Sequence, residues 1–147
     1  MTLVDRLAEA KATGNFAAMF DIVPYAKYLG LEPTCHGDEL TTTMRFSPHT
    51  IGNAALPAIH GGAIGALLES AAIFELLYRA ETIVLPKTIT LTVDYLRSAG
   101  PVDTHARGSI TRHGRRVANV RVEAWQADRA QPVATAHAIF LVMRDDV

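Results

Sequence analysis

The segment from Ile59 to Tyr78 limits most strongly how this chain can fold. Apolar residues recur in it three and four positions apart, and no proline follows until Pro86. This spacing predicts one long helix, and a helix that is apolar around most of its surface belongs in a protein core. The residues that show the spacing are Ile64, Leu67, Leu68, Ala71 and Ala72.

Two features argue against a membrane partner. His60, the glycine pair Gly61-Gly62, Glu69 and Glu75 interrupt the apolar segment, whereas a span needs about 20 nearly uninterrupted apolar residues. The N-terminus, MTLVDRLAEAKATGNF, carries acidic residues and no apolar stretch, so it predicts a short amphipathic helix and not a signal peptide. Cys35 is the only cysteine and cannot form an internal disulfide, so we expect a soluble protein of the reducing cytoplasm.

Several segments alternate apolar and polar residues, as strands do. After the leading helix and a connection that contains Pro24, DELTTTMRF (38–46) is the first of them, and a loop rich in turn formers, SPHTIGNAALP (47–57), follows. Beyond the helix come KTITLTVDYL (87–96), THARGSIT (104–111), RVANVRVEAW (116–125) and PVATAHAIFLVM (132–143). An antiparallel sheet needs one face covered, so we predict an α+β domain whose sheet wraps the single long helix.

The length and the charge of the chain limit the kinds of function that it can have. A chain of 147 residues without repeats suits one domain, taken here as 1–147. The net charge is -1 with both signs mixed, so no nucleic-acid partner is expected. The six histidines lack ligand spacing, and no HExxH or CxxC pattern occurs, so no metal site is predicted.

Glu69 is the unusual residue of the apolar segment. Its helical neighbours three and four positions away are Gly65, Ala66, Ala72 and Ile73, none of them polar. An ionised carboxylate in such surroundings is costly unless it is paired or has a task. One hypothesis is therefore a chemical role; the other is a narrow exposed strip, or an arginine partner across a subunit contact.

The glycine pair Gly61-Gly62 follows His60 where the helix begins. The first N–H groups of a helix lack intrahelical acceptors and can bind developing negative charge, and glycine lets a substrate approach. Glu69 follows Gly61 by eight residues, about 12 Å of helix rise, so a substrate or a second subunit must bring the two groups together. We expect His60 to orient this turn; a plain glycine-containing helix start is the alternative.

Three stretches carry a resemblance to a known family. NAALPAIHGGAIGALLE (53–69), TVDYLRSA (92–99) and RHGRRVANVRVEAW (112–125) are together similar to the hot-dog-fold thioesterases, specifically the PaaI-like acyl-CoA thioesterases related to 4-hydroxybenzoyl-CoA thioesterase. The resemblance extends from about Leu40 onwards. It implies a sheet rolled around a central helix, homodimers with one continuous sheet, in many members paired into homotetramers, and hydrolysis of an acyl-CoA thioester at the dimer interface without a cofactor, because coenzyme A is part of the substrate.

The resemblance also assigns roles. Glu69 corresponds to the family's catalytic carboxylate, either a general base or a nucleophile that forms a mixed anhydride. Gly61 corresponds to the residue whose N–H binds the thioester oxygen, with His60 orienting the turn. Glu69 would then face Gly61 of the partner subunit across the thioester.

The chain departs from the family pattern in two places. Where members carry Asn or Gln six residues before the histidine, this chain has Ala54, and Asn53 lies one residue further back, so its catalytic role requires a longer loop. Some relatives place a threonine one turn after the carboxylate, where this chain has Ile73; Thr88 is the alternative hydroxyl.

Binding residues follow from the same comparison. We expect the acyl group to lie against the central helix, and the residues concerned are Gly62, Ile64, Leu68 and Phe74. Arg112, Arg115 and Arg116 either bind coenzyme A phosphates or form a solvated hairpin tip. The acyl group is left open as aromatic or short to medium aliphatic. Two other functions also stay open: an acyl-CoA-binding module without catalysis, and a dehydratase acting on a hydroxyacyl thioester.

Overall fold

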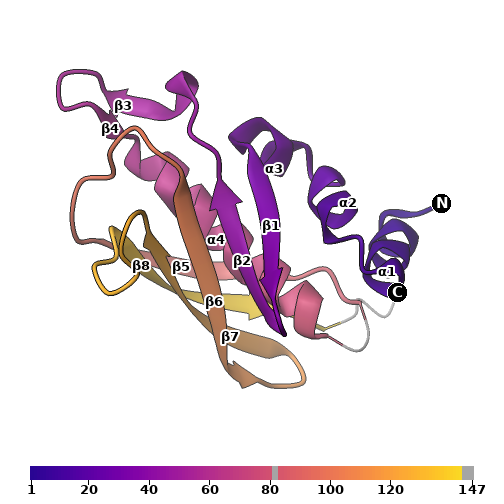
Figure 1. Ribbon diagram of the computed structural model, residues 1–147. Coiled ribbons are helices and arrows are strands. Elements are labelled where there is room, and N and C mark those ends of the chain that lie inside the picture. Colours follow the sequence, from indigo (N-terminus) through magenta and orange to yellow (C-terminus); the bar gives the residue numbers. More distant parts are fainter. Residues whose placement is uncertain (81–82, 144–147) are drawn as a thin grey trace.

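In the computed structural model, which describes residues 1–80 and 83–143, an antiparallel sheet wraps one long helix (Figure 1). The strand order is β1-β2-β6-β7-β8-β5. The strands are β1 (Leu31–His36), β2 (Glu39–Met44), β5 (Lys87–Tyr95), β6 (Thr104–His113), β7 (Val117–Trp125) and β8 (Ala134–Leu141). A ribbon of β3 (Ile51–Asn53) and β4 (Ala58–Ile59) precedes the central helix α4 (Gly61–Arg79). The predicted α+β arrangement is confirmed.

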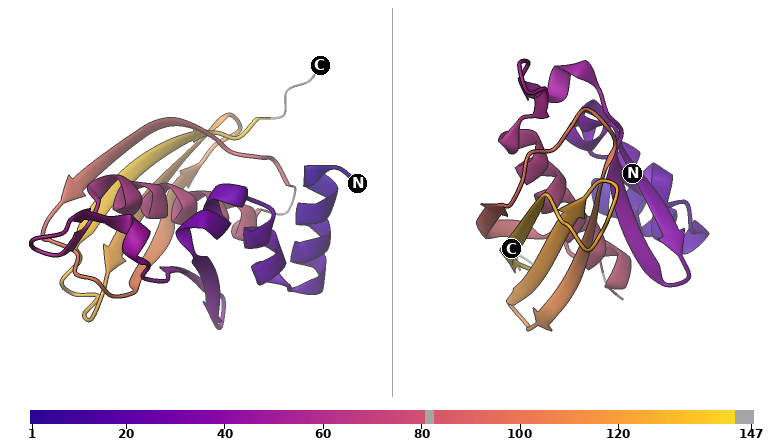
Figure 2. Two further views of the ribbon diagram at one scale, coloured as in Figure 1. Left: turned by 90° about the horizontal axis from the view of Figure 1, so that it is seen from above. Right: turned by 60° about the vertical axis from the view of Figure 1, so that its left-hand side comes forward.

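The N-terminal third contains more structure than its sequence pattern predicts. Helix α1 (Leu3–Thr13) is where we expected it. The prediction of a plain connection around Pro24 is wrong, because α2 (Phe16–Asp21) and α3 (Pro24–Leu29) form there. Pro24 begins α3, a position at which a proline loses no helical hydrogen bond. Figure 2 shows these helices gathered beside β1, away from β5.

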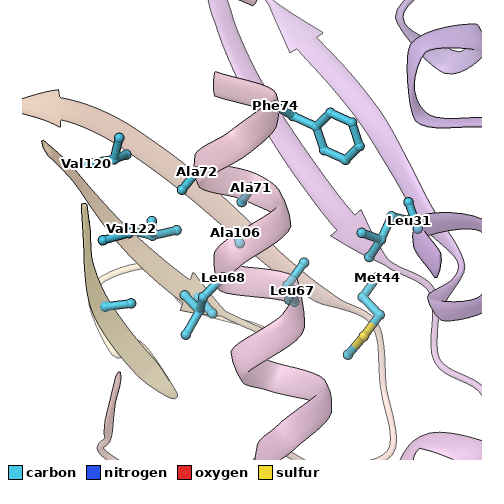
Figure 3. Packing of buried hydrophobic residues seen from close by; sticks show 14 of the residues in the cluster. Leu31, Met44, Leu67, Leu68, Ala71, Ala72, Phe74, Ala106, Val120 and Val122 are labelled. Carbon is cyan, nitrogen blue, oxygen red and sulfur yellow. The ribbon is translucent and has the colours of Figure 1, made fainter. Parts of the chain in front are cut away.

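Small side chains on the inner face of the sheet let α4 lie close to it. Leu67, Leu68 and Ala72 of α4 are fully buried there (Figure 3). The facing strands contribute Ala106, Gly108, Ala118, Ala124, Ala134 and Ala138, and a Cβ on Gly108 would lie 3.1 Å from the Cβ of Glu75. Helix α4 is long and apolar enough to resemble a membrane span, yet 56% of its apolar window is buried, as in the core helix of a soluble protein.

The two edges of the sheet differ. Strand β1 contacts α2 and α3, whereas β5 pairs with β8 and, within the described residues, has no strand on its other side. Apolar side chains on β5 are exposed, with Ile89 at 57% and Tyr95 at 56%. A bare edge of this kind is open to pairing with another strand.

The packing of α4 predicts which substitutions unfold the protein. Leu67→Ala removes a fully buried side chain and leaves a cavity, so we expect the free energy of unfolding to fall by about 2–5 kcal/mol in urea titrations. Leu56→Ala is the matched control, because Leu56 is 65% exposed and its loss should change stability by no more than about 0.5 kcal/mol. Equal losses would contradict the assigned core.

Candidate functional site

His60 caps the start of α4. Its Nδ1 accepts a hydrogen bond from the Gly62 N–H at 2.8 Å. Its carbonyl accepts from the N–H groups of Ala63 at 3.0 Å and Ile64 at 3.2 Å. Because Nδ1 is an acceptor here, the ring proton lies on Nε2. The backbone N–H of His60 donates to the Thr50 carbonyl at 2.8 Å, which fixes the cap to the preceding loop.

This capping leaves one donor of the first turn available. Gly62, Ala63 and Ile64 all donate to His60, whereas the structure gives the Gly61 N–H no acceptor among residues 1–80 and 83–143. The Gly61 N–H and the His60 carbonyl belong to the same peptide group. The carbonyl accepts two hydrogen bonds, and this polarisation of the peptide strengthens its N–H as a donor. The Gly61 N–H is thus suited to bind an oxyanion at the positive end of the helix.

The glycines of this turn are explained by close neighbours. A Cβ on Gly61 would lie 3.3 Å from the ring of Tyr95, and one on Gly62 would lie 2.9 Å from Nδ1 of His60. On Gly52 it would lie 2.7 Å from the Cα of His60. His60 therefore leaves no room for a side chain at Gly52 or Gly62, and Tyr95 would be in tight contact with one at Gly61, in addition to the substrate approach that the sequence suggested.

Sequence reasoning missed Tyr95, which belongs to the site. Its hydroxyl donates to the Gly61 carbonyl at 2.7 Å. Tyr95 pairs with Ala134 of β8, whose side chain is fully buried, so both face α4. The period of two along 87–96, once its register was known, would have placed Tyr95 on this face.

Glu69 lies on a stripe of α4 that is not fully buried by the described part of the chain. The stripe consists of Gly62, Ala66, Glu69, Ser70 and Ile73, all exposed or partly buried. Within the described part of the chain, no hydrogen bond or ion pair reaches Glu69.

Glu75, two turns further along α4, shows what a structural carboxylate looks like in this core. Its side chain is 7% exposed and accepts from Nε of Arg79 at 2.9 Å, and Arg79 also lies 3.5 Å from Asp38. Burial raises the pKa of Glu75, and Arg79 partly opposes that shift. Glu69 has no such cation among the described residues, so its carboxylate is accessible for another task.

A cavity of about 270 Å³ opens beside Gly61. Its lining is mostly apolar and includes Ile59, Ile64, Leu96, Ala99 and Val133. Glu69 is absent from that lining, so one chain holds the donor and the carboxylate at separate places.

Leu68 and Phe74, which were also predicted to contact the acyl group, are buried in the core. Leu68 is fully buried, and Phe74 is 2% exposed and stacks on Phe20 with ring centroids 3.7 Å apart. Both support the helix from inside the core of this chain (Figure 3). Gly62 lies at the surface, but its N–H is already bonded to His60.

The structure separates the remaining predicted residues. The Asn53 side-chain oxygen accepts from the N–H groups of Ala55 and Leu56, at 3.0 and 3.2 Å, so it shapes the loop before α4. Thr88 is exposed and pairs with the buried Phe140, so its side chain lies on the same side of the sheet as α4.

The three predicted phosphate contacts come together at the β6–β7 turn. Arg112, Arg115 and Arg116 line one cavity of about 350 Å³. Another cavity, of about 700 Å³, is lined by paired charges such as Arg107 with Glu39, and neither Gly61 nor Glu69 lines it. Over residues 1–80 and 83–143, no group of three His, Cys, Asp or Glu side chains could hold a metal.

Comparison with known proteins identifies the family of this chain. The family described as "Acyl-CoA thioesterase N-terminal domain" matches residues 49–141. The medium/long-chain acyl-CoA thioesterase YigI of Escherichia coli (strain K12) is 31% identical over 134 residues, which cover 82% of this chain and 86% of YigI.

Solved structures share the fold of this chain. A crystal structure of a Chromobacterium violaceum protein is 35% identical with a TM-score of 0.78, covering 97% of this chain and 99% of that one. PaaI from the phenylacetic acid degradation operon of Escherichia coli shares the fold at 19% identity, with a TM-score of 0.75 and 97% of each chain covered. The chain therefore belongs to the acyl-CoA thioesterases, enzymes that hydrolyse acyl-CoA thioesters, and it has their hot-dog fold in common with PaaI.

Proposed function

We propose that this enzyme hydrolyses medium-chain to long-chain fatty acyl-CoA to the free acid and coenzyme A, with each active site shared by two subunits. The observation that carries the proposal is a carboxylate, Glu69, that has no partner in the part of the chain that the structure describes, on the same helix as an available N–H donor, Gly61. The two lie about 12 Å apart along α4. A hydrogen-bond donor and an attacking group must each lie about 3 Å from the reacting carbonyl, so a second copy of the helix supplies the missing group.

The chemistry of such a site follows from its two groups. The thioester oxygen accepts from the Gly61 N–H of one subunit, which stabilises the negative charge of the tetrahedral intermediate. Glu69 of the other subunit removes a proton from water as the water oxygen attacks the carbonyl carbon, and returns it to the leaving thiolate as the C–S bond breaks. The alternative is direct attack by Glu69 to form an anhydride that water then cleaves.

The free edge of β5 supports a homodimer. Pairing β5 with its counterpart in a second copy would satisfy the backbone groups of the edge and cover Ile89 and Tyr95. It would also bring a second α4 toward the stripe that contains Glu69. A homotetramer formed from two such dimers belongs to the same proposal.

The proposal extends to the residues that contact the substrate. The apolar cavity beside Gly61, with Ile64 in its lining, suits an aliphatic acyl group. The 31% identity to a thioesterase named for medium and long chains supports the same class. Arg112, Arg115 and Arg116 offer charge to coenzyme A phosphates.

Two side chains remain as candidates for holding the attacking water. They are the hydroxyl of Thr88 and the side-chain NH₂ of Asn53, whose oxygen already serves the loop. For the location of the enzyme, the exposed free thiol of Cys35 fits a cytoplasmic protein.

His60 favours hydrolysis over dehydration. A dehydratase would use a histidine as its base, but Nδ1 of His60 is occupied by the Gly62 N–H. A module that binds acyl-CoA without turnover would have no need of an accessible carboxylate such as Glu69. Thiol release, ligand binding and the absorbance of an enoyl product distinguish these three functions.

Glu69→Gln tests the carboxylate. We expect normal folding and assembly but a fall in kcat of about 10²–10⁴, because the base is lost while the shape is kept. Thiol release should be measured with aliphatic acyl-CoAs of increasing length and with benzoyl-CoA, for wild type and variant together. Wild-type rates in the variant would refute the role of Glu69, and a preference for benzoyl-CoA would refute the fatty acyl class.

Gly61→Pro tests the N–H donor with little change in the backbone. Gly61 is the first residue of α4, where proline is favoured, and His60 at φ -59° and ψ 134° has the conformation that precedes proline. Removing one oxyanion donor should lower kcat by about 10²–10³. Gly61→Ala is the control: it places a carbon equally near Tyr95 but keeps the N–H, so it should retain far more activity. Equal losses in both variants would show that packing, and not the donor, matters.

Mixed dimers test whether the site is shared. Glu69→Gln and Gly61→Pro subunits are co-refolded in equal amounts, and each is inactive as a homodimer. If the groups act across the interface, each mixed dimer has one intact site, which gives about a quarter of the wild-type rate for random pairing of subunits. If both groups act from the same chain, the mixture stays as inactive as its components.

A further inference from the structure

Tyr95 connects the edge strand β5 to the start of α4. It is the last residue of β5, its hydroxyl donates to the Gly61 carbonyl at 2.7 Å, and its ring would contact a Cβ on Gly61 at 3.3 Å. A Cβ on Gly65, one turn along, would lie 3.4 Å from the same hydroxyl oxygen. Tyr95 thus packs across two small residues of the helix, and its hydroxyl is bonded to the residue that bears the candidate oxyanion donor.

The bonds around Gly61 decide where its N–H points. The peptide before Gly61 is held through the His60 carbonyl, which accepts from Ala63 and Ile64. The peptide after it is held at both ends, because its N–H donates to Nδ1 of His60 and its carbonyl accepts from Tyr95. Glycine has the widest choice of backbone conformations, so fixing both peptides is what gives the Gly61 N–H a defined direction.

We propose that the Tyr95 hydroxyl is a positioning group that sets the direction of the Gly61 N–H. The inference rests on the proposed thioesterase mechanism, in which that N–H binds the thioester oxygen. Tyr95 touches no reacting atom in this role; it acts through Gly61. Because β5 is also the free edge of the sheet, the hydroxyl fixes the donor relative to the surface on which a second subunit would pair.

Tyr95→Phe keeps the ring and removes the hydrogen bond. We expect kcat for acyl-CoA hydrolysis to fall about 10-fold with KM within about twofold of wild type, since a donor that is misdirected loses stabilisation of the transition state but not of the bound substrate. Tyr25→Phe is the matched control, because Tyr25 is 55% exposed, close to the 56% of Tyr95, and should leave both constants unchanged. An unchanged kcat, or a rise in KM alone, would overturn the proposal.

A double variant separates positioning from a general structural effect. In a Gly61→Pro background the donor is absent, so adding Tyr95→Phe should lower kcat no further. If the full loss persists there, whether through weakened dimers or local unfolding, Tyr95 does not act through the Gly61 N–H and the proposal is wrong. Equal activity of wild type and Glu69→Gln would instead overturn the proposed mechanism itself, so the two failures are distinguishable.

Discussion

The close contact of α4 with the inner face of the sheet is the constraint on which the rest of the structure depends. Alanine and glycine on β6, β7 and β8 let the sheet curve around the helix, and Leu67 and Leu68 fill the space that remains. Apolar burial of this kind contributes most of the stability of a small domain. It also determines which residues are left less buried: they form the stripe of α4 that contains Glu69.

The polar features of the site follow from how the helix begins. The first N–H groups of a helix have no intrahelical acceptors, and His60, the residue before α4, supplies acceptors with both its ring and its carbonyl. The same capping selects Gly61 as the donor that stays available. Glu69 differs from Glu75 in burial and in its neighbours: Glu75 is buried and meets Arg79 one turn later, whereas Glu69 is only partly buried and the residue one turn after it is Ile73.

Features with a local origin could be predicted from the sequence. The long helix, the strands after it, Glu69 and the glycine pair are all encoded in spacing over a few residues, and the structure has them where expected. Helices α2 and α3 have six residues each, too short to be stable alone, and depend on contacts such as the stacking of Phe20 on Phe74. Strand β1 contains Pro33 and is mostly exposed, so it shows no alternating pattern.

Contacts between residues far apart in the chain could not be predicted from the sequence. Tyr95 lies 34 residues after Gly61, and nothing local indicates that its hydroxyl reaches that carbonyl. The Asn53 oxygen is a local case: it accepts from the amides of Ala55 and Leu56, two and three residues later, which the sequence resemblance to a catalytic amide did not indicate. The resemblance to known thioesterases supplied roles for Glu69 and Gly61, but only the structure distinguishes a donor that is free from one that is occupied.

Under the proposed homodimer, the exposed edge of β5 and the separation of Gly61 from Glu69 have one explanation. A chain that covered the Glu69 stripe and the β5 edge with its own residues would be a stable monomer, but its carboxylate would be closed to substrate. A chain that left both exposed would present apolar surface and unpaired backbone groups to water. In the proposed homodimer a second copy would cover both and would bring a second α4 toward the Glu69 stripe, so assembly and catalysis would be served by one surface.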